Sequence, residues 1–85
     1  MGMDLLEYHM RIEDAFNIRI PDEDATGLLT VGQMHEYLSR RLPTLDTEQV
    51  WHRQLDVLCR FRRLDAARRA AIKASDGFVR DLNFD

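Results

Sequence analysis

The run of residues 13–25 constrains the fold of this chain more than any other stretch, because a helical pattern ends there and an extended link begins. The apolar residues before it follow a helical period that stops at Asn17, a residue that tolerates the left-handed conformation found just past helix ends. Phe16, Ile18 and Ile20 then alternate, so one side of a short extended link can face a core. The proline after Ile20 restricts it to extended geometry, and the three carboxylates that follow favour a helix N-terminus. The run therefore predicts a helix, a buried elbow and a short acidic helix.

Helical spacing of apolar residues also covers most of the remaining chain. Thr30 and Gln33 have the spacing of a capping box, in which Thr30 is the N-cap, and Pro43 ends the helix that Thr30 opens. The predicted fold class is all-α, a small helical bundle with three main helices plus a short one. We expect helices at residues 3–16, 22–28, 31–42 and 48–63, and high helix propensity at 65–71. Eight residues are expected to form the core: Leu6, Ile12, Phe16, Ile20, Leu38, Leu55, Leu58 and Phe78.

The length and composition indicate one small domain, residues 1–85. Apolar residues make up 45% and charged residues 32% of the chain, which is ordinary for a globular protein. Residues 43–47 form the single linker-like stretch. No apolar run approaches the roughly 20 residues of a membrane span, so none is expected. Cys59 has no second cysteine to pair with, and its apolar neighbours favour a buried thiol.

Residues 13–25 resemble the elbow of acyl carrier proteins, a pattern close to E-x-x-F-x-x-x-I-P-D-x-D-A. Residues 75–85 resemble the segment that leads up to the D-S-L motif of that family, which normally precedes the elbow but here ends the chain. Residues 1–42 thus resemble the C-terminal half of the family and residues 48–85 its N-terminal half, with 43–47 as a linker. The resemblance implies an acyl-carrier-like helical bundle in circularly permuted order.

Joining Asp85 to Gly2 and Met3 reproduces the D-S-L motif except that glycine stands in the place of the serine. Members of this family carry an acyl group on 4'-phosphopantetheine, which is esterified to that serine at a helix N-terminus. Because Gly2 has no hydroxyl group, we expect no cofactor on this chain and no acyl-carrying activity at this position. The resemblance otherwise implies a domain of the fatty acid biosynthesis type.

The resemblance also implies a docking surface made of carboxylates on the first helix and the short acidic helix. Acyl carrier proteins present such carboxylates to basic patches of fatty-acid or polyketide-type enzymes, or to small helical adaptor proteins in mitochondria. The localisation that the resemblance implies is the mitochondrial matrix or the bacterial cytoplasm, and both stay open. The matching residues are Asp4, Glu7, Glu13, Asp14, Asp22, Glu23 and Asp24.

Circular permutation leads to a geometric prediction about the two ends of the chain. If Asp85 and Gly2 are neighbours in the parent fold, the Cα atoms of Met3 and Asp85 should lie about 5–8 Å apart. That contact could form within one chain or between two chains of a segment-swapped dimer, because the linker is short. A monomer and a swapped dimer are therefore both open.

Other classes of function have weaker support in the sequence. The carboxylates are not accompanied by a nucleophile and base or by metal-ligand spacing, so we expect neither an enzyme nor a metal site. His9 is interpreted as a packed or rim side chain rather than a ligand. The basic run at residues 60–73 could contact nucleic acid, but a solvated helix face is the simpler interpretation, and no nucleic-acid partner is expected. A protein-interaction adaptor without acyl cargo is the alternative to a carrier-type domain.

Overall fold

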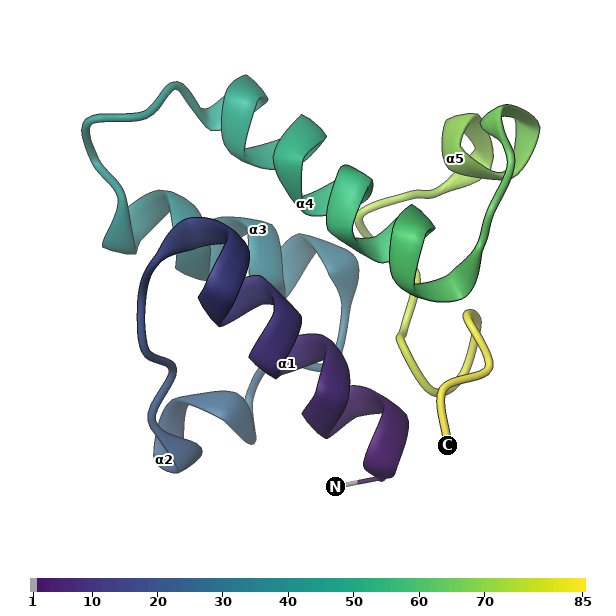
Figure 1. The fold of residues 1–85 in the computed structure, drawn as a ribbon, viewed down its shortest axis with the longest axis horizontal. Helices are drawn as coiled ribbons and strands as arrows, with labels where there is room; N and C mark the ends of the chain where they lie inside the picture. The colour runs from purple at the N-terminus through teal and green to yellow at the C-terminus, as the bar shows by residue number, and fades with distance from the viewer. Residues whose placement is uncertain (1) are drawn as a thin grey trace.

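The computed structural model describes residues 2–85, which form an all-α fold as predicted (Figure 1). In Figure 1, α1 and α4 run along the same diagonal in opposite chain directions, and α4 packs against both α1 and α3. The short helix expected at 22–28 ends earlier, at Ala25, and the stretch with high helix propensity at 65–71 does form a short fifth helix. The bounds are α1 Met3–Phe16, α2 Asp22–Ala25, α3 Val31–Arg41, α4 Thr47–Arg62 and α5 Ala66–Ala71.

The elbow after α1 has the predicted geometry. Asn17 adopts the left-handed conformation (φ 54°), and its N–H donates to the carbonyl of Glu13. The carboxylate of Glu13 then accepts a 2.7 Å hydrogen bond from the backbone N–H of Ile20, which is buried. The first residue of the elbow is thus bonded to the backbone carbonyl of Glu13 and the last to its carboxylate, so both ends of the elbow are fixed to the last turn of α1.

The two main helices of the remaining chain begin with capping boxes. The side chain of Thr30 accepts from the N–H of Gln33, whose amide oxygen accepts from Thr30 in return. Asp46 and Gln49 make the same reciprocal pair at the start of α4. Each box satisfies N–H groups that would otherwise lack a partner at a helix start, which explains why both helices begin where they do.

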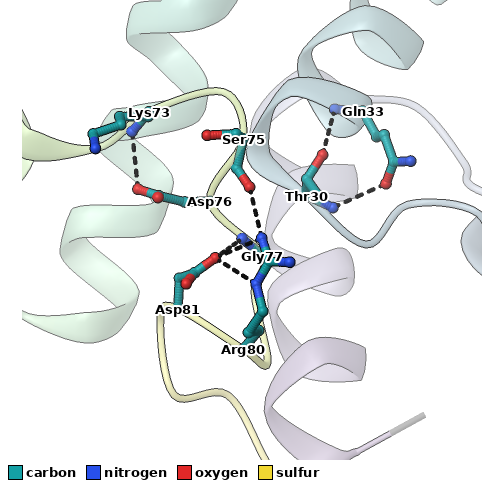
Figure 2. A network of polar contacts seen from close by, with 8 residues as sticks. All are labelled: Thr30, Gln33, Lys73, Ser75, Asp76, Gly77, Arg80 and Asp81. Atoms are coloured by element: carbon teal, nitrogen blue, oxygen red, sulfur yellow. Dashed lines mark hydrogen bonds and ion pairs between the residues drawn. The ribbon is translucent and has the colours of Figure 1, made fainter.

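A backbone pairing joins the first and second parts of the chain near the start of α3. Thr30 and Gly77 form an antiparallel bridge, and the flanking N–H groups of Val31 and Phe78 donate across it to Asp76 and Leu29. Figure 2 shows the side chains around this bridge, where the carboxylate of Asp81 accepts from the N–H of Gly77 at 2.7 Å. The loop after α5 is therefore fixed to the loop before α3.

Seven of the eight expected core residues are buried, and Leu6 is the exception, with half of its surface exposed. The buried side of α1 contains Leu5, Tyr8, Ile12 and Phe16 instead. These residues are spaced three or four apart, so they form one face, and Leu6 lies beside that face. The prediction for Leu6 was wrong because the Tyr8 ring, rather than Leu6, packs against the aromatic rings from the end of the chain.

Phe16→Ala should lower the free energy of unfolding by about 3–5 kcal/mol, because removing a buried aromatic ring leaves a cavity. Phe16 is 6% exposed and anchors the elbow end of α1. Urea denaturation of the variant and the parent chain measures the difference. Met10→Ala is the matched control on the exposed side of the same helix and should change stability by no more than about 0.5 kcal/mol. Equal effects of the two substitutions would contradict the packing of α1 described above.

Candidate functional site

An apolar stripe lies on the outer side of α1. Met3, Leu6 and Met10 are 78%, 50% and 56% exposed, and their spacing of three and four residues places them in one row along the helix. Exposed apolar side chains are common singly, but a row of three large ones on one helix is a candidate contact surface. We call these three residues the α1 stripe.

The α1 stripe borders a cavity of about 640 Å³ between α1, the elbow and α2. Leu6 and Met10 form one wall, and Ile18 and Ile20 of the elbow contribute apolar surface. Four of the predicted docking carboxylates also line this cavity: Glu13, Asp14, Asp22 and Glu23. The structure therefore brings apolar groups and carboxylates from two helices to one site, although the sequence motif alone suggested only the carboxylates.

Four of the seven predicted docking carboxylates already have partners within the chain. Asp4 pairs with Arg62 at 3.2 Å, and Glu7 pairs with Arg11 at 3.3 Å. Hydrogen bonds from Asp85 and the nearby guanidinium group of Arg62 hold the pKa of Asp4 below its usual range.

The other two engaged carboxylates have structural roles at α2 and the elbow. Asp24 accepts a 2.8 Å hydrogen bond from the hydroxyl of Tyr37 on α3, and Glu13 accepts from Ile20 as described above. Among residues 2–85, the side chains of Asp14, Asp22 and Glu23 have no hydrogen-bond or ion-pair partner, and all three are exposed. These three are the carboxylates best placed to meet a partner.

His9 lies beneath the α1 stripe and lines the same cavity. Its side chain is buried, at 4% exposed, and its Nε2 atom has no hydrogen-bond partner among residues 2–85. Burial lowers the pKa of His9 below its ordinary value of 6.5, and the carboxylate of Glu13 opposes this in part. The expectation of a packed histidine is confirmed, while its place in the wall of the cavity was not predicted.

The two ends of the described chain touch within one molecule. A Cβ atom added to Gly2 would overlap the carbonyl group of Asp85, and the N–H of Asp85 donates to Asp4 at 3.2 Å. Gly2 is the N-cap of α1 and makes no side-chain capping bond. The prediction that the ends are neighbours is therefore confirmed by direct contact between residue 85 and the start of α1.

Other chemistry has little support in the part of the chain that the structure describes. Residues 2–85 contain no group of three or more side chains that could hold a metal ion. None of their helices is long and apolar enough to cross a membrane. Cys59 is half-buried, and burial raises the pKa of its thiol. The α1 stripe with its carboxylates is thus the main candidate site.

Comparison with known proteins gives a partial similarity to acyl carrier proteins. The chain is 42% identical over 39 residues to the acyl carrier protein of Syntrophobacter fumaroxidans (strain DSM 10017 / MPOB). The matched part covers 46% of this chain and 48% of that protein, so the chain spans about half the length of the curated relative it matches. No protein-family model and no solved structure matches. The similarity is therefore distant and limited to about half of the chain.

The buried His9 should make stability depend on pH near neutrality. Its folded-state pKa is depressed, so the unfolded chain binds the proton first. The contribution of neutral His9 is thus fully present above about pH 6.5 and is lost as the pH falls through the folded pKa. Thermal unfolding between about pH 7.5 and pH 5 should show this loss, and His9→Leu should flatten the slope. An unchanged slope in the variant would contradict the burial of His9.

Proposed function

We propose that this chain is a non-catalytic, acyl-carrier-like docking domain that binds basic partner surfaces through α1 and α2. The α1 stripe beside the free carboxylates of Asp14, Asp22 and Glu23 is the observation that carries this proposal. Because Leu6 and Met10 of the stripe line one cavity with these carboxylates, a partner can bury apolar surface and pair its cations with the carboxylates at the same time. The partial similarity to an acyl carrier protein supports the same class of function.

The two kinds of group would act differently in docking. Apolar surface contributes about 25 cal/mol per Å² removed from water, so the α1 stripe supplies most of the affinity. Exposed ion pairs are worth about 0–1 kcal/mol each and are screened by salt, so the carboxylates mainly orient the partner and speed the encounter. Binding of this kind is transient, which suits a domain that serves several enzymes in turn, as in fatty acid biosynthesis.

Two observations support segments in circularly permuted order. Residue 85 lies against Gly2, so the two chain segments meet where the D-S-L motif would be continuous. A collinear comparison can cover only one of two exchanged segments, and the match to the acyl carrier protein covers 46% of the chain. In this interpretation residues 48–85 supply the N-terminal half of the carrier fold and residues 1–42 the C-terminal half.

Position 2 does not fit phosphopantetheine. Glycine has no hydroxyl to esterify, and the carbonyl group of Asp85 occupies the space that a side chain at Gly2 would need. No carrier step is therefore assigned to this position. The alternative is an adaptor that carries no acyl cargo. It predicts the same docking surface, but it predicts that a chain rearranged into the order of the family, with the serine restored, does not accept phosphopantetheine.

Docking can be tested with a synthetic basic amphipathic peptide of leucine and lysine as the probe. Replacing Asp22 and Glu23 by lysine should weaken binding by about tenfold at low salt, because two favourable charge pairs become repulsive. Leu6→Ala combined with Met10→Ala should weaken it at both low and high salt. Fluorescence anisotropy of the labelled peptide measures both effects.

Two variants serve as controls for docking. Glu36→Lys changes an exposed charge on α3, and Leu29→Ala removes an exposed apolar side chain outside the α1 stripe. Both should bind the peptide like the parent chain. Equal loss of binding in the controls and the site variants would refute a specific docking surface.

The permuted order can be tested by restoring the family order with the missing serine. A chain with residues 46–85, then serine, then residues 3–42 keeps the Asp46 cap of α4 and should fold with the same helical content. A phosphopantetheinyl transferase supplied with coenzyme A should then increase its intact mass by one phosphopantetheinyl group. The same rearranged chain with alanine in place of the serine is the control. A folded variant that gains no mass would favour the adaptor without cargo.

A further inference from the structure

A second charged groove lies between α1 and α4, outside the docking surface proposed above. It has a volume of about 400 Å³, and three arginines line it: Arg11, Arg53 and Arg60. Arg53 and Arg60 lie two helical turns apart on α4, about 10.5 Å along its axis. The half-buried Val57 lies between them and gives the groove an apolar floor. We call this the basic groove.

Aromatic rings hold two of these arginines in place without neutralising them. The guanidinium group of Arg53 lies 5.8 Å from the ring centroid of Phe16, and that of Arg11 lies 5.3 Å from that of Phe61. A guanidinium group stacked on a ring keeps its N–H edge free for a carboxylate. The arginines are thus partly ordered before any ligand arrives.

The charges around the basic groove do not cancel. Arg11 is paired with Glu7, and the carboxylate of Asp56 on the rim is paired with Arg69 at 2.7 Å. Arg53 and Arg60 have no ion-pair or hydrogen-bond partner within residues 2–85, and they outnumber the one remaining carboxylate, Asp14. The groove therefore favours an anionic ligand with at least two carboxylates.

The chain itself presents such a group on α2. Asp22 and Glu23 are exposed and unpaired within residues 2–85, while their neighbour Asp24 is bound to Tyr37, which fixes α2 on the body of the molecule. In Figure 1, α2 lies on the other side of α1 from α4. The acidic residues of α2 therefore cannot enter the basic groove of their own molecule.

We propose that the basic groove binds α2 of a second copy of this chain. Asp22 and Glu23 of one copy pair with Arg53 and Arg60 of the next, in a head-to-tail contact of the heterologous type. Such a contact leaves one acidic and one basic end free, so association proceeds beyond dimers as concentration rises. It also covers Asp22 and Glu23, so self-association and docking of a basic partner compete.

Sedimentation equilibrium at low and at high ionic strength tests this proposal. The apparent mass of the parent chain should rise with concentration at about 20 mM salt and return to that of a monomer at about 0.5 M. Arg53→Glu combined with Arg60→Glu should abolish the rise, and so should Asp22→Lys combined with Glu23→Lys. Arg60→Glu alone, which leaves the Arg53–Phe16 contact intact, should weaken it. As the control, Arg40→Glu combined with Lys73→Glu makes an equal charge change outside the groove and should self-associate like the parent chain.

Mixing the two reversed variants gives the most direct result. The groove variant has an acidic groove and an acidic α2, and the α2 variant has a basic groove and a basic α2, so each alone should stay monomeric. In the mixture, the acidic groove of the first variant meets the basic α2 of the second, so the two should associate. The groove variant should still bind the basic peptide, which separates this proposal from the docking function. A parent chain that stays monomeric at low salt, a mixture that fails to associate, or a groove that binds a polyglutamate peptide without self-association would each overturn the proposal.

Discussion

The packing of Tyr8 against the rings of Phe78 and Phe84 is the interaction on which the arrangement of the chain depends. The ring centroids of Tyr8 lie 5.1 Å and 5.6 Å from those of Phe78 and Phe84, and all three side chains are almost completely buried. Aromatic pairs at this separation contribute beyond the area they bury. Since Tyr8 belongs to α1 and the two phenylalanines to the last eight residues, this cluster joins the beginning of the chain to its end.

The same cluster decides which side of α1 is exposed to solvent. The sequence offers two apolar rows on this helix, one with Leu5, Tyr8 and Ile12 and one with Met3, Leu6 and Met10. Periodicity alone cannot choose between them, because both rows have the spacing of one helical face. The aromatic residues that select Tyr8 are about 70 positions away in the sequence. The α1 stripe is exposed as a consequence of that distant contact.

Features set by local chemistry were predictable, and those set by distant partners were not. The left-handed Asn17 and the Thr30 capping box depend on neighbours within four residues, so their sequence patterns sufficed. The roles of the acidic residues depend on longer contacts. Asp24 is occupied by Tyr37, 13 residues away, and Asp4 by Arg62, 58 residues away. A motif can therefore point to candidate docking carboxylates, but only the fold shows which of them have no partner within the described residues.

The occupied carboxylates have a direct effect on the free ones. The hydroxyl of Tyr37 donates to Asp24 and accepts from Arg41 at 2.6 Å, and Arg41 in turn donates to the backbone carbonyl of Arg19 in the elbow. This chain of bonds fastens a helix of four residues, which is too short to be stable alone. Because α2 is held through Asp24, Asp22 and Glu23 project from a fixed base rather than from a mobile loop. In the docking function proposed above, fixed charges lose less conformational entropy on binding than mobile ones, so holding α2 through Asp24 favours binding by Asp22 and Glu23.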